Sequence, residues 1–466
     1  MSANSATKKG GKKLHQQPLD SRPFLVWGLG QTGKATARYL ANRQRNFALV
    51  DSRSLEQLGE EVQSWVAQGA QGFFDGSHPA NWDAYQKILV SPGVPYDLPV
   101  LEEARAAGLQ TLAPLAWAAA MCDAPIVAVT GSAGKSTTVS LIGHMLKSSG
   151  FQTFVGGNLG TPLISILDSG EKVDRIVLEC SSFQLEATPF LDAQVTVLTN
   201  LQPNHLDRHG TMQQYADCKA RLFRPLPADR WIVLKDEDEA VLSVVEGSQA
   251  RRLWMGGVSS RSSRIFWDNS TLCLVRTGKE TEKYSMNLFG LPGHHNRENL
   301  ALAIAASRLA GANPEGIQEA IETFQGLPHR LEPVGNVADV LYLNDSKATT
   351  PDSTSKAVEA LQSEGRPVRL LIGGYPKGGG FSSLREQLKE TVAKSYFFGQ
   401  ACEELKRDLP DINFAAFPTL AGAFAAATAD AVPGETVLLS PACASFDEFR
   451  NFEERGRCFQ EMVKKL

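Results

Sequence analysis

The strongest chemical signal in the sequence is a lysine-bearing turn at residues 130–137, which reads Thr-Gly-Ser-Ala-Gly-Lys-Ser-Thr. It follows an apolar run at 126–129 and precedes a helical pattern at 136–147. In such a strand-loop-helix unit, backbone N–H groups cradle phosphates, the lysine reaches the terminal phosphates, and the next hydroxyl holds Mg²⁺. Val129 stands where the general motif has its first glycine, so this loop is a variant. We predict that ATP and magnesium bind at Gly131, Ser132, Ala133, Gly134, Lys135, Ser136, Thr137 and Thr138.

Two more side chains are candidates for the metal. Glu179 ends an apolar run at 175–179, and His205 follows another at 195–199. In a parallel sheet the carboxyl ends of the strands meet at one edge, where ligands bind. Without the phosphate loop, a strand-end carboxylate and a solvated loop histidine would be ordinary surface groups. With it, we expect both to lie near Ser136 and the ion.

A second glycine-bearing turn, Gly-Leu-Gly-Gln-Thr-Gly at 28–33, follows an apolar run at 24–27 and opens a helical pattern. Asp51 ends the next apolar run. This arrangement is typical of a dinucleotide site, where glycines allow the backbone to approach a diphosphate and the acidic residue accepts hydrogen bonds. Any nucleoside diphosphate satisfies the pattern, and NAD is the default interpretation from these residues alone.

A third glycine-rich stretch at 373–380 contains Lys377 but no Ser or Thr after the lysine, so it is not a second phosphate loop. Lys377 suits a carboxylate ligand as a point charge, and a solvated loop lysine fits equally well.

The elements that position these residues form an α/β pattern in a chain of 466 residues, long enough for about three domains. Apolar runs alternate with helical spacing throughout, and short strands near 264–267 and 271–275 predict an antiparallel annex. We predict a basic tail at 1–22, a Rossmann-like domain at 23–113, a central P-loop ATPase-like domain at 114–326 and a Rossmann-like C-terminal domain at 327–466.

Composition excludes several functional classes. Lysine and arginine number 47 against 51 acidic residues, a net charge of −4, which argues against general nucleic-acid binding. No apolar run is long enough to span a membrane, and the tail has lysines but no apolar signal segment. Seven cysteines without a C-x-x-C pair suit a reducing compartment. We expect a cytoplasmic monomer.

The ordered set of motifs resembles the muramyl peptide ligases, ATP-dependent amide-forming enzymes of bacterial wall precursor synthesis. The resemblance runs from residue 23 to the C-terminus, through the two turns and the blocks at 91–94, 179–186, 204–209, 295–299, 329–330, 344–349 and 440–447. It implies that D-glutamate is added to UDP-N-acetylmuramoyl-L-alanine through an acyl phosphate, and that the first turn binds a uridine nucleotide instead of NAD.

By the same resemblance, site residues carry over by position. Those expected at the uridine nucleotide are Gln31, Thr32, Asp51, Arg53 and Asn158. Those expected to complete the ATP site are Asn299, Arg330 and Asp345, with Lys347 beside the reacting phosphate. Those expected at D-glutamate are Thr349, Lys377, Ser445 and Phe452.

One position implied by the resemblance is chemically unusual. Lys219 matches a lysine that carbon dioxide converts to a carbamate, an anion with oxygen ligands of the kind that Mg²⁺ prefers. The expected metal set, for two ions, is therefore Ser136, Glu179, His205 and Lys219; Lys135, Glu179, His205, Lys219 and Lys347 are the expected catalytic residues. On composition alone, Lys219 is an ordinary helix-surface lysine. A related ligase with another amino acid, and a non-catalytic nucleotide switch, are the alternatives.

Overall fold

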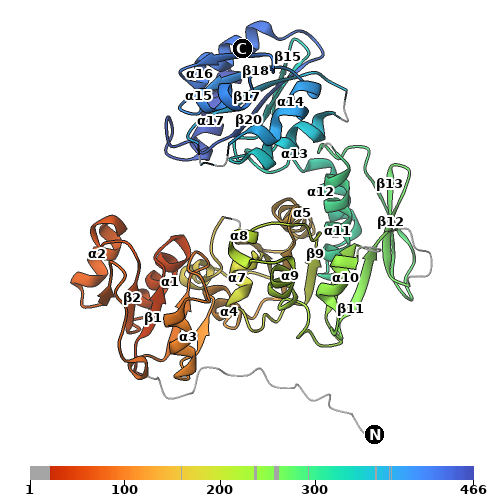
Figure 1. The fold of residues 1–466 in the computed structure, drawn as a ribbon. Coiled ribbons are helices and arrows are strands. Elements are labelled where there is room, and N and C mark those ends of the chain that lie inside the picture. Colours follow the sequence, from red (N-terminus) through yellow and green to blue (C-terminus); the bar gives the residue numbers. More distant parts are fainter. Residues whose placement is uncertain are drawn as a thin grey trace.

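The chain forms three α/β domains, each built on its own sheet (Figure 1). The computed structural model describes residues 21–466 except positions 159, 236–238, 257–261, 292, 363–364, 377 and 379. Most of the predicted tail, and Lys377, therefore lie outside the described residues. The predicted α/β class with three domains is confirmed. The exact boundaries at 113/114 and 326/327 stay predictions.

The N-terminal domain has five parallel strands in the order β3-β2-β1-β4-β5. The chain order reverses between β1 and β4, which opens a crevice at their carboxyl ends. Apolar side chains pack on both faces of this sheet. Its elements are β1 (Phe24–Trp27), α1 (Gln31–Asn42), β2 (Phe47–Val50), α2 (Glu60–Ala67), β3 (Gln71–Phe73), β4 (Lys87–Val90), α3 (Pro99–Ala106) and β5 (Thr111–Leu112).

The central domain has nine strands in the order β14-β13-β12-β11-β10-β9-β6-β8-β7. The pairs from β7 to β12 are parallel, and β12, β13 and β14 pair antiparallel. The predicted annex is therefore antiparallel, but it is not separate, because β12 continues the main sheet. These strands are β6 (Ile126–Thr130), β7 (Thr153–Gly157), β8 (Arg175–Glu179), β9 (Val195–Leu198), β10 (Trp231–Lys235), β11 (Arg251–Met255), β12 (Arg264–Asp268), β13 (Thr271–Val275) and β14 (Glu282–Ser285).

Helices cover both faces of the central sheet. Helices α5, α11 and α12 contribute to one apolar core, and α4, α6, α7, α9 and α10 to the other. The P-loop helix α5 packs along α11 and α12. The helices are α4 (Pro114–Ala119), α5 (Lys135–Ser148), α6 (Ile164–Ser169), α7 (Ser182–Glu186), α8 (Leu206–His209), α9 (Met212–Ala220), α10 (Glu239–Val245), α11 (His294–Leu309) and α12 (Pro314–Thr323).

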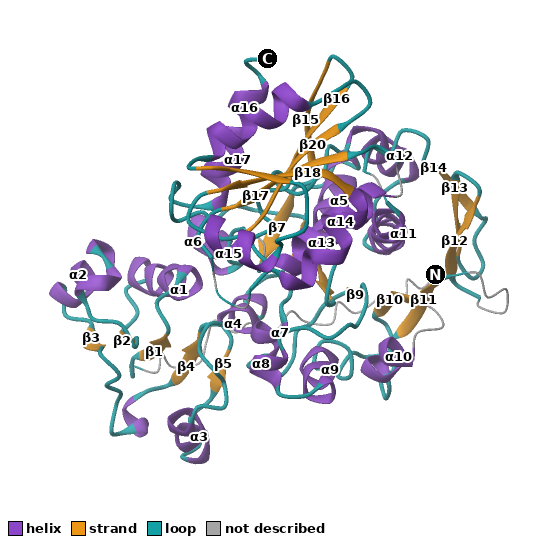
Figure 2. Ribbon diagram, turned by 45° about the horizontal axis from the view of Figure 1, so that its top comes forward, coloured by secondary structure: helices purple, strands orange, loops and turns teal. Residues whose placement is uncertain are grey.

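The C-terminal domain has six strands in the order β15-β16-β20-β17-β18-β19, all parallel except for β15. Figure 2 shows strands of this sheet in orange, with helices of the domain in purple around them. None of the helices in the described part of the chain is long and apolar enough to cross a membrane. The elements are β15 (Glu332–Val337), β16 (Val340–Asn344), α13 (Pro351–Gln362), β17 (Val368–Gly373), α14 (Arg385–Thr391), β18 (Val392–Phe398), α15 (Cys402–Asp408), β19 (Phe414–Phe417), α16 (Leu420–Asp430), β20 (Thr436–Ala442) and α17 (Phe452–Val463).

Candidate active site

A cavity of about 420 Å³ lies at the carboxyl edge of the N-terminal sheet and reaches the central domain. All five side chains predicted to bind the uridine nucleotide line it: Gln31, Thr32, Asp51, Arg53 and Asn158. The cavity joins two domains, because Asn158 comes from the loop after β7 and the Gln31 amide donates to the Gly160 carbonyl at 3.2 Å. The structure therefore brings these predicted residues together across a domain boundary.

The glycine turn of this cavity is held by close packing and by Asp51. A Cβ on Gly33 would lie 1.9 Å from the Gly28 carbonyl oxygen, so α1 approaches the turn as only glycine permits. Asp51 accepts from the Leu29 N–H at 2.6 Å and from the Arg53 guanidinium at 2.8 Å. Burial opposes ionisation of Asp51, but the hydrogen bonds from Arg53 and Leu29 outweigh it and lower its pKa. Asp51 thus shapes the turn and orients Arg53.

The P-loop connects β6 to α5. Lys135 begins the helix, one residue before the predicted start, and its Nζ donates to the Gly131 and Ser132 carbonyls at 3.0 and 2.9 Å. Gly134 has a φ of 78° and packs on Asn299, where a Cβ would lie 2.3 Å from the amide oxygen. Burial lowers the pKa of Lys135. The loop is therefore a tight turn whose ammonium lies at its centre.

Glu179 and Ser136 form the centre of the predicted metal site. Glu179 pairs with Val129 across β6 and β8, so it ends its strand beside the P-loop. Its buried carboxylate accepts from the Ser136 hydroxyl at 2.6 Å and from the Asn158 amide at 2.7 Å. A hydroxyl and a carboxylate side by side are oxygen ligands of the kind Mg²⁺ requires, so these residues fit the ion. Asn158 also links this centre to the cavity at the N-terminal sheet.

Lys219 is buried, with 1% of its surface exposed, so its interpretation as a helix-surface lysine is wrong. Helix α9 directs it inward beneath the P-loop, where Nζ donates to the Gly131 carbonyl at 2.9 Å and lies 4.4 Å from the Tyr215 ring centroid. Burial and the charge of Lys135 lower its pKa to about 7. Lys219 thus lies next to the phosphate loop, as expected from its predicted role.

His205 precedes α8 with a φ of 54°, and its ring centroid lies 4.8 Å from that of Phe183. Its part in metal binding stays a prediction.

A cavity of about 410 Å³ spans the central and C-terminal domains at the P-loop. Three predicted ATP residues outside the P-loop, Asn299, Arg330 and Asp345, line it, and so does Lys347. Arg330 Nη2 lies 3.4 Å from the Ser136 hydroxyl. Asp345 accepts from the Ser440 hydroxyl at 2.8 Å, and burial raises its pKa to about 7. Groups from both domains therefore converge on one cavity.

Two of the residues predicted for D-glutamate, Thr349 and Ser445, come from loops at the carboxyl edge of the C-terminal sheet, and a third, Phe452, begins α17. Thr349 follows β16, and Ser445 follows β20, its neighbour. The Lys347 ammonium lies 4.3 Å from the centroid of the Phe452 ring. Helix α17 ties these loops together, because fully buried Arg455 donates to the carbonyls of Ser346, Cys443 and Ala444.

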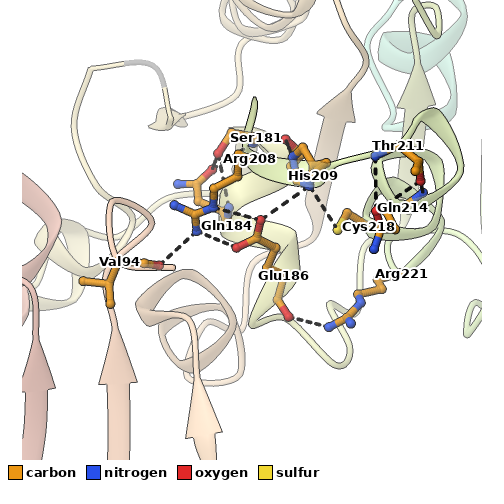
Figure 3. Close-up of polar contacts among 11 residues, drawn as sticks. Val94, Ser181, Gln184, Glu186, Arg208, His209, Thr211, Gln214, Cys218 and Arg221 are labelled. Atoms are coloured by element: carbon orange, nitrogen blue, oxygen red, sulfur yellow. Dashed lines mark hydrogen bonds and ion pairs between the residues drawn. The ribbon is translucent and has the colours of Figure 1, made fainter. Parts of the chain in front are cut away.

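A partly buried network joins α8 to the N-terminal domain (Figure 3). Arg208 contacts the Glu186 carboxylate at 2.6 Å and donates to the Val94 carbonyl at 3.0 Å. Glu186, His209 and Cys218 offer ligand atoms within 4.8 Å of one another. We interpret this cluster as structural because the Arg208 guanidinium already neutralises the carboxylate.

Several residues that line the cavity at the P-loop were not predicted to bind ATP. His295 and Asn296 line it from α11, and Ser353 and Lys356 line it from α13. The first two lie in a recognised sequence block without an assigned role. Lys356 pairs with Asp352 one helical turn away, at 2.7 Å, which is the usual pattern of a solvated helix face. The sequence therefore gave no signal for Lys356.

A mainly parallel sheet with a phosphate-binding loop, in a domain between two further α/β domains, defines a three-domain nucleotide-binding protein. Family models match all three parts: "Mur ligase MurD-like, N-terminal domain" at residues 22–113, "Mur ligase middle domain" at 129–307 and "Mur ligase, glutamate ligase domain" at 329–443. The chain belongs to the Mur ligase family, which confirms the predicted resemblance.

Curated relatives cover nearly the whole chain. A UDP-N-acetylmuramoylalanine–D-glutamate ligase of Desulfosudis oleivorans is 37% identical over 96% of this chain and 97% of its own. A protein of the same name from Geobacter metallireducens is 35% identical over 96% of this chain and 98% of its own. Another, from Symbiobacterium thermophilum, is 37% identical over 96% of this chain and 99% of its own.

Solved structures share the fold at low identity. MurF from Acinetobacter baumannii aligns with a TM-score of 0.59 at 17% identity, covering 91% of this chain and 92% of its own. The UDP-N-acetylmuramate-alanine ligase MurC from Thermotoga maritima aligns with a TM-score of 0.57 at 17% identity, covering 95% and 99%.

Proposed function

We propose that this chain joins D-glutamate to UDP-N-acetylmuramoyl-L-alanine in an ATP-dependent reaction of wall precursor synthesis. The observation that carries this proposal is the single cavity that holds the P-loop together with Arg330, Asp345 and Lys347 of the C-terminal domain. A reaction between a phosphate donor and an amino acid needs such a meeting of domains. The names of the relatives support the choice of substrates over a related ligase or a nucleotide switch.

An amine does not react with a free carboxylate, because the oxygen that must be expelled is a poor leaving group. The carboxylate must therefore be activated first. The L-alanine carboxylate of the sugar nucleotide attacks the γ-phosphorus of ATP, which releases ADP and leaves an acyl phosphate. The neutral amine of D-glutamate then attacks the acyl carbon, and inorganic phosphate leaves as the amide forms. Lys135 and Lys347 offset the negative charge of the transferred phosphoryl group, and the cavity aligns the reactants.

Magnesium fits the Ser136 and Glu179 oxygens, and when bound it supplies neutralisation of phosphate charge. We assign His205 to the same magnesium site. We also propose that a carbamate formed on Lys219 holds a second magnesium ion. Burial of Lys219 beside the Gly131 carbonyl supports the carbamate, because a neutral amine is the form that combines with carbon dioxide. The role that we assign to Asn299, Arg330 and Asp345 is to bind ATP in the cavity at the P-loop.

We assign the remaining substrates to the other predicted residues. The uridine nucleotide lies in the cavity of Gln31, Thr32 and Asn158 with Asp51 and Arg53. D-glutamate lies at Thr349, Lys377, Ser445 and Phe452. A cytoplasmic monomer is consistent with this role, since the substrates are small nucleotides and amino acids.

The test is an amide-forming assay with purified chain, ATP, magnesium and UDP-N-acetylmuramoyl-L-alanine. Phosphate release and product should require D-glutamate. Equal turnover with L-glutamate or meso-diaminopimelate would contradict the substrate assignment. Substrate labelled with ¹⁸O in its alanine carboxylate should transfer label to the released phosphate, and unlabelled phosphate would contradict the acyl-phosphate route.

A further inference from the structure

A second polar cavity, of about 610 Å³, lies in the central domain and is lined mainly by cationic side chains. Of the ten lining residues in the described part of the chain, five are basic and none is acidic; the basic ones are Arg251, Arg252, Arg276, Lys279 and Arg308. The whole chain has a net charge of −4, so such a concentration of positive charge runs against its overall composition. The cavity therefore favours an anionic occupant.

This cavity is separate from both nucleotide cavities. Arg251 and Arg252 begin β11, Trp231 begins β10, and Arg308 lies in the last turn of α11. The P-loop and Glu179, in contrast, follow the carboxyl ends of β6 and β8, which run parallel to β10 and β11. The basic cavity thus lies at the amino edge of the sheet. It is on the side of the molecule away from the N-terminal domain, where β11 and the β12–β13 hairpin are seen in Figure 1.

Helix α11 contributes residues to both the ATP cavity and the basic cavity, so it shows how far apart they lie. His295, Asn296 and Asn299 in its first two turns line the ATP cavity, whereas Arg308 lines the basic cavity. At 1.5 Å per residue, Arg308 lies about 14 to 20 Å along the helix from these three residues, so the two cavities are separate.

The positive charge of this cavity is only partly neutralised within the protein. The Glu282 carboxylate bridges Arg276 and Arg308, with Arg308 Nε at 2.6 Å. Arg251 instead stacks on the Trp231 ring, with its guanidinium carbon 5.6 Å from the centroid. Arg252 donates from Nη2 to the Val245 carbonyl, and its buried Nε has no hydrogen-bond partner among the described residues. Neither Arg251 nor Arg252 pairs with a carboxylate among the described residues, so their positive charges are left for an anion to offset.

We propose that this basic cavity binds a small molecule carrying a diphosphate group. Counting one charge for each basic side chain and Glu282, the local excess is about four positive charges, which a diphosphate offsets better than a single phosphate. Guanidinium groups form paired hydrogen bonds with phosphate oxygens, and the Ser263 hydroxyl is a further polar group in the lining. The cavity is also large enough for the group that carries the diphosphate.

The test is calorimetric titration of inorganic pyrophosphate into the full chain. The test variant is Arg251→Gln with Lys279→Gln, which removes two exposed cations without disturbing the Glu282 ion pairs. The matched control is Arg385→Gln with Lys389→Gln, which removes two surface cations, one of them half-buried, that already pair with Asp411. Pyrophosphate also fits the P-loop and the uridine cavity, so the number of sites per chain is compared between proteins of equal thermal stability.

Wild type and the control should bind one more equivalent of pyrophosphate than the test variant does. If the test variant still binds that equivalent, its affinity should be about tenfold weaker, which corresponds to a loss of 1.4 kcal/mol of interaction. Orthophosphate should bind this site more weakly than pyrophosphate. Identical titrations of wild type and the test variant would overturn the site, and equal affinity for orthophosphate would overturn its preference for diphosphate.

Discussion

At the scale of single residues, the phosphate site depends on side chains that hold one another in position. Asn158 lines the uridine cavity and also donates to Glu179, whose other oxygen accepts from Ser136. We expect Asn158→Ala to raise the magnesium concentration needed for half-maximal ligation and to lower kcat by about tenfold to a hundredfold, as is typical when a residue supporting a metal ligand is removed. Initial rates over a magnesium series measure this.

Asn42→Ala is the matched control for that change. Its amide donates to the Asp168 carboxylate at 2.9 Å in an exposed contact, so the same type of hydrogen bond is lost away from both cavities. Its magnesium dependence should equal that of wild type. An unchanged magnesium requirement in Asn158→Ala would show that Asn158 does not orient Glu179.

The same residues illustrate what sequence could and could not predict. The phosphate loop and Glu179 are local signals, because a strand-end position and a Gly-Lys-Ser turn are visible in a short window. Lys219 is buried because of the direction in which α9 packs under the P-loop. Lys356 lines a cavity because of where α13 lies relative to the central domain. Those contacts are tertiary, so periodicity alone could not give them.

At the scale of elements, α8 has only four residues and needs anchors from outside itself. Arg208 is its main anchor, through Glu186 of α7 and the Val94 carbonyl next to the uridine cavity (Figure 3). We expect Arg208→Ala to cost about 2 kcal/mol of folding free energy, the scale of hydrogen bonds to a charged group, and to weaken uridine-nucleotide binding. Chemical denaturation and equilibrium binding of UDP measure the two effects.

Arg221→Ala is the control, because Arg221 donates to the backbone carbonyl of the same Glu186 without touching the N-terminal domain. It should leave UDP affinity unchanged. Equal UDP affinity in Arg208→Ala and wild type would contradict a link between α8 and that cavity.

The edge of the central sheet has its own acid-sensitive anchor in Glu282, which joins β14 to α11 through Arg308. Burial opposes its ionisation, but bonds from Arg308, Tyr284 and Arg276 lower its pKa to about 2, from 4.5. The ionised form therefore stabilises the fold fully above pH 4.5, and this contribution is lost as the pH falls toward 2. Glu282→Gln should be less stable than wild type by about 2 kcal/mol at pH 7, and the difference should shrink below pH 4.5.

Urea midpoints at pH 7, 4 and 3 check this prediction. Glu171→Gln, an exposed carboxylate, should show no comparable gap at pH 7. A gap for Glu282→Gln that stays constant down to pH 3 would mean that packing, and not charge, is lost in the variant.

At the scale of the whole molecule, the cavity proposed to bind ATP exists only because the central and C-terminal domains meet, so a bound ligand should order both domains. Gly134 and Thr137 contribute from the central domain, and Arg330, Asp345 and Ser353 contribute from the C-terminal domain. The sequence located these groups in separate α/β units but could not place one unit against the other, since contacts such as that between Ser136 and Arg330 join side chains 194 residues apart.

We expect a non-hydrolysable ATP analogue with magnesium to slow amide hydrogen exchange in two distant segments at once, the P-loop at 131–138 and the loop at 345–349. At a concentration 100 times its Kd the ligand stabilises the native state by about 2.7 kcal/mol, so the melting temperature should also rise. Lys135→Ala should lose protection in both segments together, because the C-terminal loop depends on the ligand held by the P-loop. Protection confined to 131–138 in wild type would mean that the ligand contacts the central domain alone, and the cavity between the domains would then not be the ATP site.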